Sequence, residues 1–449
     1  MKVNRKIFRE YDIRGIVEED LKGDFPYFLG KAFGSYVKRL KVNSVIVGGD
    51  NRNTTKDIKE KLISGILSTG IDVVDIGTIP TPVLYFSTHY YNSGGGIMVT
   101  ASHNPPEFNG FKMVVKGKSI YGEEIQKLAD LIENEDFEEG KGKVSEKDAK
   151  SDYINFLVEN FKFKKRLRVG VDTGNGTVGP LISELFGKLN LEMEGIYLES
   201  NGDFPNHLPD PVVPENLKDL INLVKEKKLD VGLGFDGDGD RLGVVDENGE
   251  ILWGDYLLII YMREILKEKP KSKIIFDVKC SKALEEEIKK AGGIPVMWKT
   301  GHSLIENKLH EEKAPLAGEL SGHLYFYDRY YGFDDAIYAS LRLLEIMDKT
   351  GKKLSELLKG VKKYFSTPEI RVEVPDEKKF EIVKNLQNYF RGKYPISEID
   401  GAKVYFPDGW ALVRASNTQP ALVIRIEGES ENSLQRIKEE FFKIIEKFK

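Results

Sequence analysis

One arrangement recurs three times along this chain and limits the folds open to it. An apolar strand ends in an aspartate, a short polar loop follows, and a helix then begins. The copies start with the strands at residues 45–50, 167–172 and 274–277. Fully apolar strands that alternate with helices are typical of a mostly parallel sheet covered on both faces. We therefore expect three similar α/β domains of about one hundred residues, related as a weak internal repeat.

The C-terminal part of the chain has a different pattern. Residues 370–374 alternate apolar and polar side chains, a helix is expected over 377–390, and two strands at 410–413 and 422–426 flank a polar loop. This pattern predicts a small α+β domain with an antiparallel sheet. A charged stretch at 133–150 is expected to mark the end of the first domain. The predicted domains are residues 1–148, 149–250, 251–366 and 367–449.

Composition excludes several classes of function. The 449 residues carry a net charge of −5, and Lys and Arg are scattered, so we expect no nucleic-acid-binding face. No window is long and apolar enough to predict a membrane span, and the N-terminus lacks the pattern of a secretory signal. Cys280 is the only cysteine, which fits a reducing compartment. A cytoplasmic protein is expected, and its oligomeric state is left open.

A serine lies in a stiff loop between two probable strands. The segment 100–106 reads Thr-Ala-Ser-His-Asn-Pro-Pro, so that Ser102 follows one apolar run and precedes another at 111–115. Loops held by a rigid scaffold often carry catalytic groups. The same residues are also common in ordinary turns. From these residues alone, both interpretations stay open, although ligands do gather at the carboxyl ends of strands in α/β units.

Three aspartates alternate with glycines in one short loop and indicate a metal site. Asp236, Asp238 and Asp240 can face a single point because glycine lets the backbone fold tightly. Gathering three anions without a cation is costly, and their oxygen ligands suit Mg²⁺. An EF-hand calcium loop is disfavoured, because its sixth position must be glycine and here it is Arg241, and because the flanks are strand-like; a polar hairpin loop without a metal is the other alternative. An open metal position beside Arg241 suits a phosphoryl group.

Two further polar loops could bind a ligand, although hairpin turns would explain each of them. The loop 318–323 places Glu319, Ser321 and His323 between glycines, which suits a polyhydroxylated ligand. The loop after residue 413 holds a cluster of donors suited to a phosphate dianion, namely Arg414, Ser416, Asn417 and Thr418. Three of the six histidines fall in these proposed site loops: His103, His302 and His323.

Together these motifs resemble the α-D-phosphohexomutase family. The segments 100–105, 236–241, 318–323 and 414–420 look like its phosphoserine, metal, sugar-specificity and phosphate-binding loops, in the same order across the whole chain. Residues 277–280 and 297–303 are also close to the phosphomannomutase/phosphoglucomutase branch. The resemblance implies a heart-shaped molecule of four domains around a central cleft. It also implies an isomerase that moves a phosphoryl group between O6 and O1 of a hexose.

The resemblance implies roles for individual residues. Ser102 is expected to carry phosphate in the resting enzyme and to share Mg²⁺ with the three aspartates, with Arg241 beside them. A hexose 1,6-bisphosphate is the implied intermediate and activator. A positioned base must take the proton of the substrate hydroxyl, and its unranked candidates are Lys112, His302 and His323. The residues expected to bind the hexose phosphate are Arg14, Lys279, Glu319, Ser321, Arg414, Ser416, Asn417 and Thr418.

The sugar preference is less constrained. In the family the third residue of the 318–323 loop tracks substrate, with Gln in glucosamine-type members and Met in mannose/glucose-type members; here it is Leu320. An apolar residue favours mannose or glucose phosphates. The alternatives are a phosphoglucosamine mutase, a phosphatase that admits water to the same serine and metal, and a sugar-phosphate-binding protein without activity.

Overall fold

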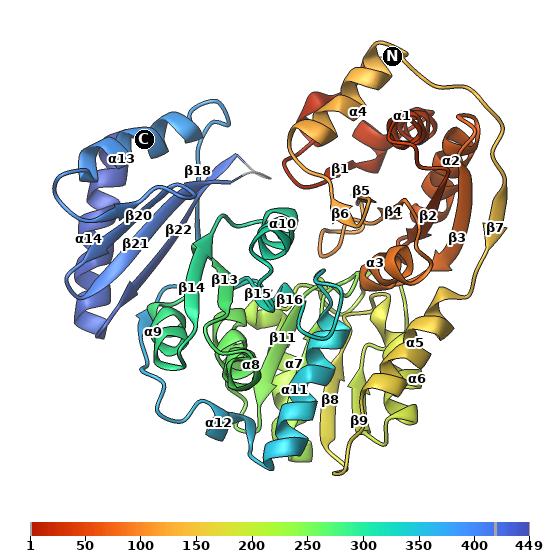
Figure 1. Cartoon of the computed structure of the whole chain (residues 1–449). Coiled ribbons are helices and arrows are strands. Elements are labelled where there is room, and N and C mark those ends of the chain that lie inside the picture. The colour runs from red at the N-terminus through yellow and green to blue at the C-terminus, as the bar shows by residue number, and fades with distance from the viewer. Residues whose placement is uncertain (1, 417–419, 449) are drawn as a thin grey trace.

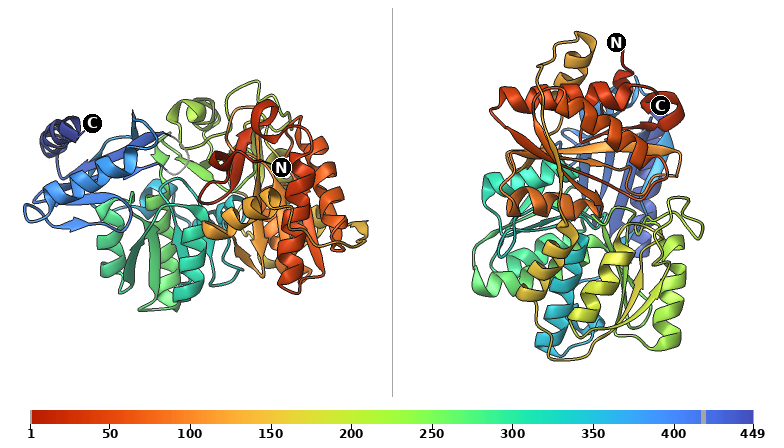
Figure 2. Two further views of the ribbon diagram at one scale, coloured as in Figure 1. Left: turned by 90° about the horizontal axis from the view of Figure 1, so that it is seen from above. Right: turned by 90° about the vertical axis from the view of Figure 1, so that its right-hand side faces the viewer.

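The computed structural model describes residues 2–416 and 420–448. Figure 1 shows four domains around a centre, with the first and fourth as two upper lobes and the second and third as the base. Seen from above, the fourth domain lies at one end of the molecule and the first at the other (Figure 2). This is the predicted heart-shaped arrangement of three α/β domains and one α+β domain.

Domain I is built on a mixed sheet in the order β1-β5-β4-β2-β3-β7, with β6 added to β5. The charged stretch expected to be a domain boundary contains β7, an edge strand parallel to β3, before the chain leaves the domain. The elements are β1 (Ile13–Ile16), α1 (Phe25–Arg39), β2 (Ser44–Gly49), α2 (Thr55–Leu67), β3 (Asp72–Thr78), α3 (Thr81–Tyr90), β4 (Gly95–Val99), β5 (Phe108–Val115), β6 (Lys118–Ser119), α4 (Glu123–Glu133) and β7 (Val144–Glu146).

Domains II and III are smaller versions of the same plan. Domain II contains α5 (Ala149–Asn160), β8 (Arg168–Asp172), α6 (Val178–Lys188), β9 (Glu192–Ile196), α7 (Lys218–Lys227), β10 (Val231–Phe235), β11 (Leu242–Asp246) and β12 (Ile251–Leu252). Domain III contains α8 (Gly254–Glu268), β13 (Lys273–Asp277), α9 (Lys282–Lys290), β14 (Ile294–Trp298), α10 (His302–Glu312), β15 (Leu316–Gly318), β16 (Leu324–Phe326), α11 (Ala336–Thr350) and α12 (Leu354–Leu357).

The topology confirms the weak internal repeat. The central strands follow the orders β3-β2-β4-β5, β9-β8-β10-β11 and β14-β13-β15-β16. In each domain the first three strands are parallel and the fourth is antiparallel to the third. The loop between the third and fourth strands is therefore equivalent in all three domains. These equivalent loops carry Ser102, the three aspartates and Glu319.

Domain IV has an antiparallel sheet and its own core, as predicted. The amphipathic C-terminal helix α14 buries Ile437, Phe441, Ile444 and Ile445 on this sheet. In contrast, one large apolar core runs through domains II and III and reaches residues of domain I. The elements of domain IV are β17 (Phe365–Ser366), β18 (Ile370–Glu373), α13 (Lys379–Phe390), β19 (Ile396–Ser397), β20 (Ala402–Phe406), β21 (Gly409–Ala415), β22 (Ala421–Gly428) and α14 (Glu431–Phe448).

Candidate active site

Ser102 lies at the carboxyl end of β4, where its backbone is held in an uncommon conformation. Its φ of 51° is in the left-handed region, and its side chain is buried. Arg52, itself paired with Asp50, donates hydrogen bonds to the Ser102 carbonyl at 2.7 Å and to the Asn104 carbonyl at 2.6 Å. The buried Arg52 guanidinium donates to several carbonyls of the loop at once. These hydrogen bonds hold the loop in place and stabilise the left-handed conformation of Ser102.

The three aspartates occupy the hairpin between β10 and β11, so their flanks are strands, as the exclusion of an EF-hand requires. Asp236, Asp238 and Asp240 are each fully buried, and each offers an oxygen within 4.8 Å of the others. Asp236 Oδ1 accepts the backbone N–H of Asp240 at 2.9 Å, which closes the loop on itself. The glycine pattern therefore does bring three carboxylates to one point.

The serine loop and the carboxylate loop meet across the boundary between domains I and II. Ser102 Oγ donates a hydrogen bond of 2.6 Å to Asp236 Oδ2. A Cβ added to Gly237 would lie 2.5 Å from the Ser102 carbonyl oxygen, so only glycine permits this approach. His103 Nδ1 lies 3.2 Å from Ser102 Oγ, as expected of a neighbour within the same loop.

The donor set fits a hard divalent cation. Asp238 Oδ1 and Asp240 Oδ1 are buried and have no hydrogen-bond partner among the described residues. Burial raises the pKa of Asp236 well above its ordinary value, and the charges of Asp240 and Asp238 raise it further. Buried anionic oxygens without donors are ligands that Mg²⁺ accepts. The buried acidic site of the structure can therefore hold a metal ion.

Lys112 projects from β5 into the same carboxylates. Its Nζ lies 2.8 Å from Asp238 Oδ2 and also contacts Asp240 Oδ2. Burial alone would lower the pKa of Lys112, but the charges of the two aspartates outweigh it and raise the pKa. Lys112 is therefore a cation in this arrangement, and a protonated ammonium does not serve as a base.

The other two candidate bases have different surroundings. His323 Nε2 accepts a hydrogen bond of 3.0 Å from Arg241 Nε, and its Nδ1 lies 2.8 Å from Asp334 Oδ2. Both His302 Nε2 and His323 Nδ1 are buried without a hydrogen-bond partner among the described residues, but only His323 has a carboxylate in contact with its ring. Burial lowers the pKa of His302 well below its ordinary value and also lowers the pKa of His323, so both rings are neutral.

The sugar-loop residues do not all face the same way. Glu319 accepts the backbone N–H of Gly301 at 2.8 Å, and both Glu319 and Ser321 line a cavity. Leu320 is only 8% exposed, packs in the apolar core and is not among the cavity residues. Any influence of Leu320 on the sugar must therefore be indirect.

The predicted phosphate loop lies between β21 and β22 and is described only in part. Arg414 is buried; its Nε donates to Asp400 Oδ2 at 2.9 Å, while its Nη2 has no partner among the described residues. Ser416 lines the same cavity as Arg414. Asn417 and Thr418 lie outside the described residues.

Residues of all four domains line a cavity of about 450 Å³. Its lining includes nine of the predicted residues: Arg14, Arg241, Lys279, His302, Glu319, Ser321, His323, Arg414 and Ser416. Ser102, Lys112 and the three aspartates are buried next to it rather than in its lining. Although the chain is acidic overall, its lining is rich in cations, which raises the local concentration of anionic ligands.

Two of the lining cations are held by acidic neighbours. Arg14 donates to Asn104 Oδ1 at 2.7 Å and to Asp12 Oδ2 at 2.6 Å. Lys279 Nζ lies 3.4 Å from Glu369 Oε2 and 3.6 Å from Asp277 Oδ2. Burial would lower the pKa of Lys279, but Glu369 and Asp277 raise it, so the side chain stays charged.

Several residues of this site were not predicted from the sequence. Thr81 Oγ1 donates to Asp238 Oδ2 at 2.6 Å, and Asp334 lies against His323. Further unpredicted residues line the cavity, among them Arg9, Tyr11, Asp12, Asp210, Thr300, Glu369 and Arg371. A usable signal existed for Arg52 and Thr81, since each follows a strand at its carboxyl end, where ligands gather. Nothing in the sequence singles out the others.

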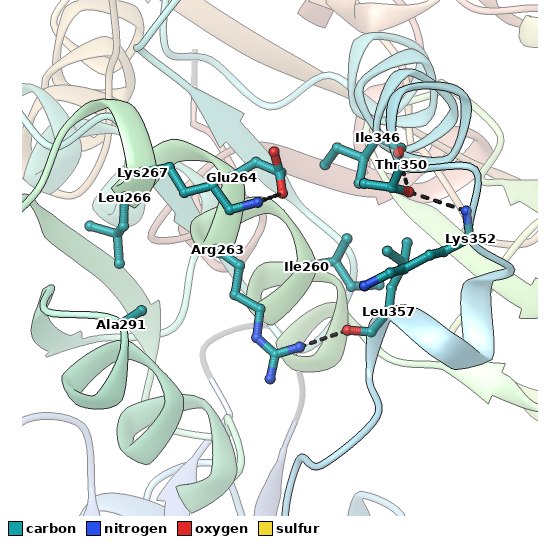
Figure 3. Close-up of a pocket in the computed structure, with 10 residues that line it drawn as sticks. All are labelled: Ile260, Arg263, Glu264, Leu266, Lys267, Ala291, Ile346, Thr350, Lys352 and Leu357. Carbon is teal, nitrogen blue, oxygen red and sulfur yellow. Dashed lines mark hydrogen bonds and ion pairs between the residues drawn. The ribbon is translucent and has the colours of Figure 1, made fainter.

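A second cavity, of about 390 Å³, lies in domain III between α8 and α11 (Figure 3). Two of its charged side chains already have partners: Arg263 donates to the backbone carbonyl of Leu357 at 2.6 Å, and Lys267 contacts Glu264. None of the predicted site residues lines it.

Comparison with known proteins agrees with the site. The chain matches the four sequence families described as phosphoglucomutase/phosphomannomutase α/β/α domains I, II and III and C-terminal domain, at residues 5–139, 151–249, 253–364 and 369–444. The chain belongs to the phosphoglucomutase/phosphomannomutase family. The predicted class of enzyme, an isomerase of the phosphohexomutase type, is thereby confirmed.

Individual relatives resemble the chain over its full length. It is 44% identical to the phosphomannomutase/phosphoglucomutase of Pseudomonas aeruginosa over 97% of this chain and 94% of the relative. It is 40% identical to a phosphoglucomutase of Neisseria gonorrhoeae over 99% and 97%. A crystal structure of a phosphoglucomutase/phosphomannomutase family protein from Burkholderia thailandensis superposes with a TM-score of 0.93 at 41% identity, covering 99% and 97% of the two chains.

In the described part of the chain, no helix combines the length and the apolar character needed to cross a membrane.

Proposed function

We propose that the protein interconverts hexose 6-phosphate and hexose 1-phosphate, with mannose, glucose or both as the sugar. The observation that carries this proposal is the contact between Ser102 and the three-aspartate loop beside a cation-rich cavity lined by four domains. The names of the full-length relatives, phosphomannomutase and phosphoglucomutase, support the same sugars. Phosphoryl transfer depends mainly on positioning and charge neutralisation, and this site provides both.

Asp236, Asp238 and Asp240 would hold Mg²⁺, together with an oxygen of phosphate on Ser102. When bound, the ion would neutralise negative charge on the transferring phosphoryl group. Arg241 lies beside these carboxylates and would add a fixed positive charge. Lys112, already paired with Asp238 and Asp240, would keep the carboxylates in place and offer a further cation to the phosphoryl oxygens.

The substrate would bind with its existing phosphate on the Arg414 loop. Arg414 Nη2 is buried and has no partner in the described part of the chain, and Ser416 supplies a hydroxyl to the same cavity. Asn417 and Thr418 complete the set of donors that the sequence predicts for this loop. Glu319 and Ser321 would bind the sugar hydroxyls, while Arg14 of domain I and Lys279 of domain III, which both line the cavity, would contact the anionic ends of the substrate.

In the first transfer, the bond between phosphorus and Ser102 Oγ breaks and a bond from phosphorus to the substrate hydroxyl forms. The hydroxyl loses its proton to a base, and the product is a hexose 1,6-bisphosphate. After the bisphosphate has turned end over end, its other phosphate faces Ser102. The reverse steps then return a phosphoryl group to Ser102, return the proton to the sugar oxygen, and leave the isomerised monophosphate. The bisphosphate is therefore both the intermediate and the activator of an unphosphorylated enzyme.

His302 is the favoured base among the three candidates. Its Nε2 has no partner within residues 2–416 and 420–448, its ring is kept neutral by burial, and it lines the cavity. His323 is already engaged by Arg241 and Asp334, which suits a residue that orients the Arg241 guanidinium. Lys112 is held as a cation by two carboxylates.

The test compares initial rates on the 1-phosphates of mannose, glucose and glucosamine, with Mg²⁺ and the matching 1,6-bisphosphate present. Formation of the 6-phosphate from mannose or glucose is expected. Faster turnover of glucosamine 1-phosphate would show that glucosamine, rather than mannose or glucose, is the preferred sugar. Release of inorganic phosphate without isomerisation would indicate a phosphatase, and binding without either reaction would overturn the proposed activity.

A further inference from the structure

A side chain of domain IV hydrogen-bonds to the backbone of the turn that carries Lys279. This turn, residues 278–280, directly follows β13 of domain III. Lys403 on β20 donates a hydrogen bond of 2.8 Å to the Val278 carbonyl and one of 3.4 Å to the Cys280 carbonyl. These two carbonyls stand immediately before and after Lys279, so one ammonium group fixes both sides of that residue.

Lys403 is an unusual residue for such a position. It is only 4% exposed, and no carboxylate lies within ion-pair distance of it in residues 2–416 and 420–448. Its Nζ instead lies 3.9 Å from the centre of the Trp410 ring and 3.8 Å from Met297 Sδ. Burial lowers the pKa of Lys403 to about 8. Because a well-packed apolar residue is often at least as stable as a buried charge, stability alone does not account for a lysine here.

Neighbouring strands of domain IV hold the far end of the same segment. Glu427 on β22 accepts the backbone N–H of Lys282 at 2.9 Å and the Trp410 indole N–H at 2.7 Å. Trp410 on β21 in turn lies under the Lys403 ammonium. Val278 packs with Trp410 and Leu412 of β21, so the segment from the turn to the start of α9 contacts three adjacent strands of domain IV, although it belongs to the chain of domain III.

The Lys279 side chain extends from domain III towards an acidic residue at the start of domain IV. Its Nζ lies 3.4 Å from Glu369, in the segment by which the chain enters domain IV, and 3.6 Å from Asp277 at the end of β13. Lys279 lines the cavity, and Lys403 does not. Any effect of Lys403 on the ligand must therefore pass through the turn.

We infer that Lys403 is a positioning residue that places Lys279 for the hexose phosphate. The packing of domain IV on domain III thereby determines where the Lys279 ammonium lies in the cavity. This inference rests on the proposed function, since Lys279 acts there as a substrate-binding cation. Lys403 itself touches neither the substrate nor the reacting atoms. Its contribution is to hold the turn so that the Lys279 ammonium enters the cavity in one place.

A double-mutant cycle with Lys403→Met and Lys279→Met tests the inference. Methionine keeps an unbranched side chain over Trp410 but cannot donate to the two carbonyls. The single Lys403→Met variant is expected to raise KM for glucose 1-phosphate by roughly tenfold with kcat changed by less than about threefold, because binding energy is lost in ground and transition states alike. In the Lys279→Met background, Lys403→Met is expected to change KM by less than about twofold, since residues that act through each other are not additive.

Effects that multiply in the double variant would overturn the inference, because they would show that Lys403 acts independently of Lys279. Lys403→Gln, which keeps a neutral donor of shorter reach, replaces Lys403→Met in the cycle if the methionine variant does not fold. Tyr405→Phe is the matched control. Tyr405 lies on the same strand at the same interface, and its hydroxyl reaches Met297 Sδ at 4.0 Å. It is expected to leave KM unchanged.

A crystal structure of the Lys403→Met or Lys403→Gln variant separates this inference from the proposed function, since it requires no activity. Displacement of Lys279 from its contacts with Glu369 and Asp277 is expected. An unmoved Lys279 would overturn the inference even in an active enzyme. In contrast, a wild-type protein that neither binds nor turns over hexose phosphates would overturn the proposed function, whatever the position of Lys279.

Discussion

Ser102 Oγ and Asp236 Oδ2 share a hydrogen bond of 2.6 Å across the boundary between two domains, although 134 residues separate them in the chain. The contact depends on Gly237, because any side chain at that position would collide with the Ser102 carbonyl. A serine that is to carry phosphate must lie beside a cation site, and this contact places it there. The proposed chemistry therefore depends on how domains I and II pack.

Replacing Ser102 with alanine is expected to reduce turnover of glucose 1-phosphate and mannose 1-phosphate alike by at least about a thousandfold, because the carrier of the phosphoryl group is lost. Intact-protein mass after incubation with glucose 1,6-bisphosphate should show phosphate on the wild type and none on Ser102→Ala. Ser64→Ala, an exposed position on α2 of the same domain, is the control. Full activity in Ser102→Ala would disprove the phosphoserine mechanism.

Asp238→Asn is expected to weaken Mg²⁺ binding by roughly tenfold or more and to lower activity accordingly, since an amide replaces one of three anionic ligands. The measurement is the Mg²⁺ concentration that gives half-maximal rate. Asp246→Asn is a suitable comparison. Asp246 is the last residue of β11, the strand that follows the carboxylate loop, and it accepts backbone N–H groups of its own turn. An unchanged Mg²⁺ requirement in Asp238→Asn would argue against the metal assignment.

Lys112→Met is expected to lower activity and to increase the stabilisation of the fold by Mg²⁺. The variant leaves Asp238 and Asp240 without their cation, and an uncompensated buried charge costs about 3–5 kcal/mol. Mg²⁺ should therefore raise the Tm of Lys112→Met by more than it raises the Tm of the wild type. The control is Lys116→Met, in the exposed turn after β5. An equal Mg²⁺-induced shift in all three proteins would contradict the role of Lys112 as a partner of the carboxylates.

Glu306 predicts a pH dependence of stability that is separate from catalysis. Glu306 on α10 of domain III is buried against Ser119 of domain I, and burial raises the pKa of its carboxyl to about 8, with a smaller increase from Asp334. Since the folded protein holds this proton more tightly than the unfolded chain, the stabilisation is complete below about pH 4.5 and is lost as pH rises towards 8.

The Tm is therefore expected to fall between pH 5 and pH 8 in the wild type and to fall less in Glu306→Gln. A loss of about 1 kcal/mol shifts Tm by roughly 2–4 °C in domains of 150–250 residues. Glu311→Gln, on the same helix but exposed, is the control. Parallel pH profiles for the wild type and Glu306→Gln would contradict this prediction.

Leu320→Met is expected to change the ratio of kcat/KM for mannose and glucose 1-phosphates by less than about threefold, since a buried apolar exchange of similar volume is well tolerated. A larger change would show that this side chain controls the sugar preference despite lying outside the cavity lining.

The apolar strands and the alternating strands of the last domain could be predicted, because each depends on the order of apolar and polar residues within a short window. The carboxylate loop could be predicted for the same local reason, since its glycines and aspartates are adjacent. Asp334 and Lys403 could not. Each acts on a segment that is near only in space, and no spacing in the sequence marks such a contact.

By itself the sequence determined the fold class, the family and the four loops proposed to carry chemistry, because these reside in local patterns and in their order along the chain. Only the tertiary structure decided that three of those loops occupy the same place in a repeated sheet, between the third parallel strand and its antiparallel neighbour. It also decided which candidate base is unpartnered, since His302, His323 and Lys112 differ in their buried neighbours rather than in their flanking residues. Burial and pairing arise from the packing of domains, and packing joins residues that the chain keeps far apart.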